Sequence, residues 1–193
     1  PASAVTASAT PVFAAAESGT VSAGALTINL AQFGPGVLVD VIRQQLELAN
    51  IKNPSEQAGF VVYETSVLPE VFRRQRLALE YAGPLLMRSA VIIDFDDVGD
   101  RDSNVQTYER IRQALIREYG NPSRTLEEGE FSQQIVAEVN DQRFIRITEW
   151  STDKGTLRFG IPRRLDGQVR MEIQHSIGFP SPRDTLWSVE AVR

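Results

Sequence analysis

The chain has 193 residues, of which 42% are hydrophobic and 23% are charged, and its formal net charge is −5. These values are typical of a globular protein with one domain, and the acidic excess argues against nonspecific nucleic-acid binding, which requires positive charge. The absence of cysteine excludes disulfides, thiolate metal ligands and a cysteine nucleophile.

Residues 1–24 are rich in alanine, serine and threonine, almost free of charge, and begin with Pro1 rather than methionine. Such a segment buries too little apolar surface to order itself, so we predict a disordered tail at 1–24 and a single domain at 25–193. This composition is typical of the region that follows a removed signal peptide, which predicts a periplasmic or secreted protein. No apolar run approaches the roughly 20 residues that cross a bilayer, so no membrane span is expected.

The first half of the domain predicts a short strand at 25–30, a helix from Pro35 to about Ala49 and a strand at 60–65. Residues 66–82 leave two interpretations open. A strand there buries Leu77, Leu79 and Tyr81, whereas a helix begins near Pro69 and buries residues that include Val71 and Phe72. The content of glutamate, arginine, glutamine, leucine and alanine favours the helix, and residues 60–95 would then form a right-handed parallel β-α-β crossover.

The stretch from Leu85 to Pro122 has the clearest local signals. Residues 85–95 are apolar on both faces of a predicted strand, which is typical of a strand inside a sheet. An acidic loop follows. A helix is predicted from Ser103, with Gln106 completing a capping box, to Gly120, after which Pro122 prevents its continuation.

The C-terminal part predicts a helix at 128–140 and then three strands at 143–150, 155–161 and 168–175, joined by turns at 153–155 and 163–167. In the third strand Arg170, Glu172 and Gln174 alternate with apolar residues, so the meander is expected to have one solvated face. Trp187–Val192 is expected to be a closing edge strand. The predicted fold class is α+β, an antiparallel C-terminal meander packed with about three to four helices, and no internal repeat is visible.

The motif Val91-Ile92-Ile93-Asp94-Phe95-Asp96-Asp97-Val98 resembles the first motif of haloacid-dehalogenase-type phosphatases. The resemblance implies that Asp94 attacks phosphorus, that Asp96 is the acid/base and that both hold Mg²⁺. The later elements of that family, a serine or threonine, a lysine and a second acidic pair on parallel strand–helix units, are missing. A magnesium-dependent phosphoester hydrolase therefore remains an alternative rather than the main prediction.

The same loop places Asp94, Asp96, Asp100 and Asp102 at ligand positions of a calcium loop, which makes them candidate metal ligands. Two further positions that need oxygen ligands hold Val98 and Val105 instead. The competing interpretation is structural, because acidic residues before a helix stabilise its positive N-terminal end.

Arg158, Arg163, Arg164 and Arg170 fall on or beside the strands predicted at 155–161 and 168–175 and are candidates for an anion or partner patch. The competing interpretation is a solvated strand face on which Asp166 and Glu172 offset part of the charge. His175 is the only histidine, and we expect it to be a partly buried, satisfied side chain, since no nucleophile elbow accompanies it.

The alanine-rich start and the helix exit Tyr119-Gly120-Asn121-Pro122 loosely resemble exported bacterial proteins that carry a domain of unknown function. The main prediction is a non-catalytic exported module that binds a protein partner or a small ligand, without a cofactor. Two alternatives remain, the hydrolase that uses Asp94 and Asp96 and a structural homo-oligomer that associates through its terminal edge strand.

Overall fold

The computed structural model describes residues 33–57, 59–65, 67–68, 71–95 and 101–190. The expected tail at 1–24 and the expected strand at 25–30 lie outside these residues. In the described part of the chain, no helix is long and apolar enough to pass through a membrane.

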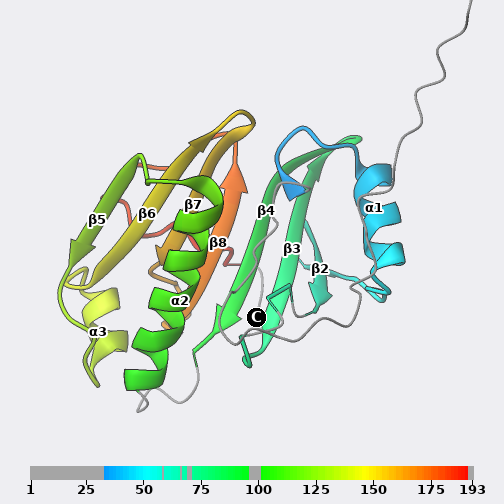
Figure 1. Cartoon of the computed structure of the whole chain (residues 1–193). Coiled ribbons are helices and arrows are strands. Elements are labelled where there is room, and N and C mark those ends of the chain that lie inside the picture. The colour runs from blue at the N-terminus through cyan, green and yellow to red at the C-terminus, as the bar shows by residue number, and fades with distance from the viewer. Residues whose placement is uncertain (1–32, 58, 66, 69–70, 96–100, 191–193) are drawn as a thin grey trace, which may run out of the picture.

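Eight strands form one antiparallel sheet in the order β1-β2-β3-β4-β8-β7-β6-β5 (Figure 1). The strands are β1 Ser55–Gln57, β2 Phe60–Glu64, β3 Gln75–Ala82, β4 Leu85–Asp94, β5 Arg124–Glu128, β6 Ile145–Thr152, β7 Gly155–Ile161 and β8 Arg170–Ser176. The helices are α1 Val39–Leu48, α2 Arg101–Tyr119 and α3 Ile135–Asn140.

The strand order shows that the chain consists of two similarly connected halves. In each half a helix precedes a four-stranded meander, α1 before β1–β4 and α2 before β5–β8, with α3 inserted between β5 and β6. The halves join where β4 pairs with β8, and Val91 lies opposite Ile173 at the centre of that pairing. This structural repeat is not visible in the sequence, where none was expected.

The predicted α+β arrangement is wrong, because one antiparallel sheet makes up most of the structure and only three helices accompany it in the described residues. The helix predicted within 66–82 is a strand, β3, and Leu77 and Leu79 are fully buried on it, as the strand interpretation required. Antiparallel pairing of β2 with β3 and of β3 with β4 also excludes the predicted parallel crossover. Burial on both faces of the sheet overrides the helix propensity of this segment.

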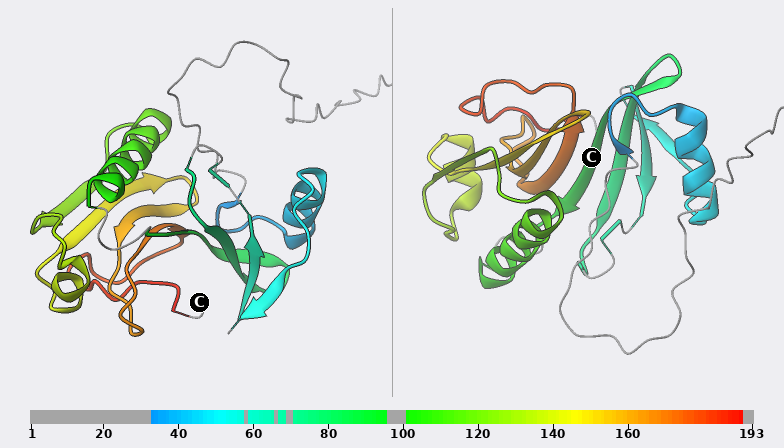
Figure 2. Two further views of the ribbon diagram at one scale, coloured as in Figure 1. Left: turned by 90° about the horizontal axis from the view of Figure 1, so that it is seen from below. Right: turned by 45° about the horizontal axis from the view of Figure 1, so that its top comes forward.

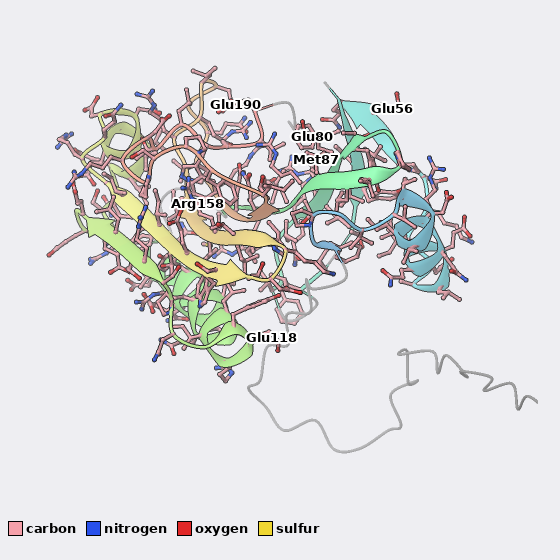
Figure 3. All side chains as sticks on the ribbon, turned by 90° about the horizontal axis from the view of Figure 1, so that it is seen from above. Glu56, Glu80, Met87, Glu118, Arg158 and Glu190 are labelled. Atoms are coloured by element: carbon pink, nitrogen blue, oxygen red, sulfur yellow. The ribbon has the colours of Figure 1, made fainter. Side chains whose placement is uncertain are left out.

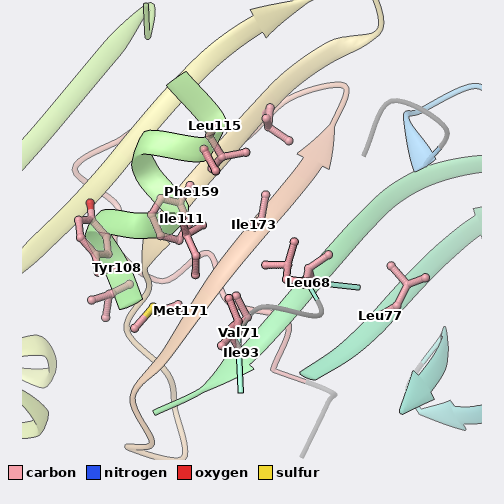
Figure 4. Packing of buried hydrophobic residues seen from close by; sticks show 14 of the residues in the cluster. Leu68, Val71, Leu77, Ile93, Tyr108, Ile111, Leu115, Phe159, Met171 and Ile173 are labelled. Carbon is pink, nitrogen blue, oxygen red and sulfur yellow. The ribbon is translucent and has the colours of Figure 1, made fainter. Parts of the chain in front are cut away.

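The three helices contribute to one hydrophobic core on a single face of the sheet, which we call the helix face. Figure 4 shows α2 directing Tyr108, Ile111 and Leu115 onto Phe159 of β7 and Ile173 of β8. The core also receives residues of α1, α3 and the loop before β3, namely Ile42, Leu46, Ile135, Val139, Leu68 and Val71. One continuous core therefore underlies both halves.

Several local predictions are confirmed and others are displaced by a few residues. Helix α2 ends at Tyr119, and Gly120 follows with φ of 78°, a left-handed conformation that suits glycine. The helix begins before Ser103, so Ser103 is not its cap, and its hydroxyl accepts a hydrogen bond of 2.7 Å from Arg73 instead. The helix predicted at 128–140 is reduced to α3, because residues 124–128 form β5.

Strand β4 contains an irregularity that the sequence pattern did not reveal. The register between β3 and β4 shifts between Glu80 and Tyr81, which corresponds to a β-bulge. A bulge moves the following side chains to the other face of the strand. Consequently Leu86, rather than Leu85 or Met87, lies in the core of the helix face.

We call the opposite face of the sheet the open face, because the three helices pack on the other one. Residues 177–190, the C-terminal segment, cover the open face. Figure 2 shows this segment and α2 on opposite sides of the sheet. Trp187 and Val189 of the segment are buried against sheet residues, but Trp187–Glu190 do not form the predicted edge strand, and residues 191–193 lie outside the description. The predicted solvated face is therefore wrong, since Arg170, Glu172 and Gln174 are 3%, 0% and 0% exposed.

Candidate functional site

The predicted metal ligands do not assemble into a site in the described residues. Asp94 lies at the end of β4, where its carboxylate accepts a hydrogen bond from Arg76 and lies 3.3 Å from Nε of Arg170. Asp96 and Asp100 fall outside the described residues, and Asp102 is exposed in the first turn of α2. Among the described side chains, no group of three histidines or carboxylates gathers as a metal centre requires.

The setting of Asp94 differs from the one that the hydrolase alternative implies. The phosphatase motif operates at the end of a strand in a parallel sheet, whereas β4 has antiparallel neighbours on both sides. Asp94 also faces arginines, which occupy its oxygens. Within the described residues, this acidic position contributes to internal ion pairing.

The predicted arginine patch is largely buried rather than exposed. Arg158, Arg164 and Arg170 are at most 3% exposed, whereas Arg163 is half-buried and donates its backbone N–H to Thr185. Arg164 forms two hydrogen bonds with Asp166, of 3.0 and 2.7 Å, and these lower the pKa of Asp166 to about 2. A buried guanidinium requires such partners, so the charges of Arg158, Arg164 and Arg170 are used in internal pairing.

Glu172 links the sheet to the C-terminal segment. Its buried carboxylate accepts hydrogen bonds from the Ser188 hydroxyl and, at 3.0 Å, from the backbone N–H of Val189. Gln174 donates to the same carboxylate at 2.7 Å and to the carbonyl of Trp187 at 2.9 Å. The alternating polar residues of β8 thus fix the segment across the open face.

The most complete candidate site is a pocket of about 490 Å³ between the sheet and the start of the C-terminal segment. We call it the Arg158 pocket, after the arginine that projects from β7 (Figure 3). Its floor comes from the open face of β6 and β7 and from the start of β5, and its wall from residues 178–182. The lining residues are Ser123, Arg124, Glu149, Ser151, Thr156, Arg158, Gly178, Phe179, Pro180, Ser181 and Pro182.

Arg158 organises this pocket. Its Nε and Nη2 atoms donate to one oxygen of Glu149 at 2.8 and 2.6 Å, and Nη2 also donates to the carbonyl of Pro180 at 2.8 Å. The guanidinium lies 4.4 Å from the ring centroid of Phe179 and 5.4 Å from that of Trp187, within cation–π range. Burial lowers the pKa of Arg158, and the hydrogen-bonded Glu149 carboxylate opposes that shift. Arg158 therefore connects the strands that form the floor of the pocket to the C-terminal residues that form its wall.

The groups that remain for a ligand differ from those that build the pocket. Arg124 has a side chain that is 57% exposed, and its Nη1 lies 3.7 Å from the second oxygen of Glu149, beyond hydrogen-bond distance. Ser151 is exposed and Thr156 is half-buried on the same face. Two guanidinium groups and one carboxylate give the lining a formal charge of +1. The pocket thus offers one accessible cation surrounded by hydroxyl groups.

The equivalent position in the first half shows why the pocket depends on its surroundings. Arg76 on β3 lies opposite Glu64 on β2, just as Arg158 lies opposite Glu149. However, Arg76 donates to Asp94 on its other side and is 0% exposed. The same strand position is therefore used for internal ion pairing in one half and for a pocket in the other.

Sequence reasoning identified Arg158 but assigned it to an exposed patch, and it did not pair Arg158 with Glu149. A signal for this pair was present. The turn between Thr152 and Gly155 has two residues, which fixes the register of the hairpin and places Glu149 opposite Arg158. Arg124 and Phe179 carried no comparable signal, because they reach the pocket through β5 pairing and through the path of the C-terminal segment.

His175 lies on the helix face in the same register as Ile173, as predicted, and it is buried. Its Nε2 lies 3.0 Å from the hydroxyl of Thr152, while Nδ1 has no hydrogen-bond partner within the described part of the chain. Gly34 packs so closely that a Cβ there would lie 3.1 Å from the imidazole. The histidine therefore belongs to the packing of the N-terminal described residues against β8, on the face of the sheet opposite the Arg158 pocket.

Comparisons with protein-family models, with curated proteins and with solved structures find no match to this chain. The chemistry of the Arg158 pocket therefore has to be deduced from the residues that line it.

Proposed function

We propose that the chain is a non-catalytic binding module that holds a small anionic ligand in the Arg158 pocket. The observation that carries the proposal is the accessible guanidinium of Arg124, placed above a floor whose own charges, Glu149 and Arg158, are already paired. We propose a periplasmic or secreted location for this activity, and the support for it is the composition of residues 1–24.

The ionisable groups of the pocket favour recognition over catalysis. The described residues that line it include no histidine, lysine, cysteine or tyrosine. Glu149 is the only carboxylate among these described lining residues, and one of its oxygens receives two hydrogen bonds from Arg158. A general base needs an oxygen within hydrogen-bond reach of the proton that it removes, so this arrangement supports a structural role for the carboxylate.

Size and charge support the ligand class. The pocket volume of about 490 Å³ lies in the range that accommodates small molecules. An arginine fork matches a carboxylate or phosphate group in geometry and charge. The half-buried ring of Phe179 and the hydroxyl groups of Ser151 and Thr156 suit a ligand that also carries a ring or hydroxyl groups.

The proposal is tested by NMR titration of the full chain with small carboxylates, among them glucuronate, with glucose as the uncharged match. We expect glucuronate to shift the amide signals of Ser151, Thr156 and Ser181 and glucose to shift them much less. Arg124→Gln should weaken the response by about tenfold or more, since a hydrogen bond to a charged group is lost. Arg183→Gln is the matched control, because Arg183 is a 77% exposed arginine outside the pocket.

Two results would contradict this function. If glucose and glucuronate shift the same signals equally, the pocket does not select anions. If every carboxylate tested leaves these signals unchanged, or shifts signals on another surface, the Arg158 pocket is not the binding site.

A further inference from the structure

Strand β5 is one of the two edges of the sheet. It pairs with β6 on one side, and the described residues place no strand on its other side (Figure 1). Its five residues, Arg124, Thr125, Leu126, Glu127 and Glu128, are exposed apart from the half-buried Leu126. An edge of this kind presents unpaired backbone groups to any chain that can pair with them.

The register shows which backbone groups point outward. The N–H of Ser123 donates to the carbonyl of Glu149, so that carbonyl faces β5. Arg124, Leu126 and Glu128 are in register with Glu149, Ile147 and Ile145 of β6. Backbone groups alternate between the two neighbours of an antiparallel strand, so Thr125 and Glu127 direct theirs away from β6.

The side chains of this edge are self-complementary. If a second β5 pairs antiparallel about Leu126, Arg124 lies opposite Glu128 of the partner subunit, and Leu126 lies opposite its own copy. Thr125 then exchanges backbone hydrogen bonds with Glu127 of the partner subunit. Oppositely charged residues that lie directly across a strand pair stabilise it, whereas like charges destabilise it.

We infer that a second copy of this chain pairs with β5 in this register and forms a two-fold dimer with a continuous sheet. Both charged side chains are partly exposed, Arg124 at 57% and Glu128 at 43%. Among the described residues, Arg124 lies 3.7 Å from Glu149, and Glu128 accepts a long hydrogen bond of 3.4 Å from the 77% exposed Arg183. The Arg124–Glu128 pairing would form twice, once on each side of the two-fold axis.

The other edge of the sheet is not self-complementary. Strand β1 has three residues, and Glu56 lies at its centre (Figure 3). Antiparallel self-pairing of β1 about Glu56 would place two carboxylates opposite each other, which is unfavourable. The two edges therefore predict a closed dimer rather than a growing chain of subunits.

Because a five-residue edge buries a small area, the dimer should be weak and concentration-dependent. Sedimentation velocity of the full chain over a concentration series measures it. Arg124→Glu and Glu128→Arg, each alone, place like charges opposite each other and should weaken self-association by about tenfold or more. The double variant Arg124→Glu/Glu128→Arg restores opposite charges and should restore the dimer.

An equimolar mixture of the two single variants is the most specific test, since every charge then meets its opposite across the interface. The mixture should form a heterodimer that is tighter than the homodimer of either variant alone. Glu56→Arg at the other edge is the matched control and should leave association unchanged, and circular dichroism with urea unfolding confirms that each variant is folded.

A wild-type chain that stays monomeric at every concentration overturns the inference. So does a dimer that persists in both single variants, or single variants that fail to associate when mixed. The Glu128→Arg variant separates the result from the pocket proposal, because Glu128 does not line the Arg158 pocket, whereas Arg124 takes part in both.

Discussion

The buried His175 predicts a loss of stability in mild acid. The Thr152 hydroxyl donates its hydrogen to the carbonyl of Gly155 at 3.0 Å and accepts the backbone N–H of Lys154 at 3.2 Å. The contact with His175 at 3.0 Å must therefore be a donation from Nε2, so Nδ1 carries the unprotonated lone pair. A proton added at Nδ1 would have no acceptor in the described residues and would place a charge in a buried site.

Burial accordingly lowers the pKa of His175, the positive charge of Lys154 lowers it further, and Asp153 opposes the change. The unfolded chain binds a proton near the ordinary histidine pKa of about 6.5, whereas the native protein does so only at lower pH. As the pH falls below about 6.5, protonation therefore favours the unfolded state, with a slope of at most about 1.4 kcal/mol per pH unit. Above that pH the contribution of this histidine is constant.

The assay is urea unfolding between about pH 7.5 and 5.5, a window that lies above the ordinary carboxyl pKa values. We expect the free energy of unfolding of the wild type to fall by about 1 kcal/mol across it. His175→Gln keeps a donor for Thr152 but cannot titrate, so this fall should disappear. An equal fall in both proteins, or a wild type that becomes more stable in acid, would refute the assignment of a neutral, buried His175.

Two further predictions concern packing. Gly160→Ala should cost at least about 2 kcal/mol of unfolding free energy, because a Cβ there would lie 1.8 Å from the Arg146 carbonyl on β6. Gly178→Ala, where nothing lies within 4 Å, should be near neutral, and equal urea midpoints for both variants would contradict this. Leu68→Ala should cost about 3 kcal/mol, since Leu68 is 0% exposed in the core, whereas Phe72→Ala, at 92% exposed, should change thermal stability little. A larger loss of stability from Phe72→Ala than from Leu68→Ala would contradict the burial of Leu68 and the exposure of Phe72.

Part of the candidate site could have been predicted from the sequence. The strands predicted at 143–150 and 155–161 and the two-residue turn between Thr152 and Gly155 fix a hairpin, and that hairpin pairs Glu149 with Arg158. The burial of the pair could not be predicted in this way. It results from the C-terminal segment, whose Pro180 carbonyl and Phe179 ring approach Arg158 from about twenty residues farther along the chain.

The segment before β4 shows a second limit of prediction from the sequence. Residues 75–82 have the composition of a helix, yet they form β3, since Leu77 and Leu79 fill the helix face while Arg76 reaches Asp94 on the open face. A strand interpretation was present in the alternation of these residues. The choice between the two depended on neighbours that the local sequence does not contain.

The sequence by itself determined the turns, the end of α2 at Gly120 and the strands whose alternation is strict, because these depend on the conformational preferences and side-chain directions of adjacent residues. Only the tertiary structure decided that β4 pairs with β8, that the polar residues of β8 are buried and that Arg124 stands over a pocket. Those outcomes depend on contacts between segments far apart in the chain. Their free energy comes from burial and ion pairing that exist only after the two halves and the C-terminal segment have come together.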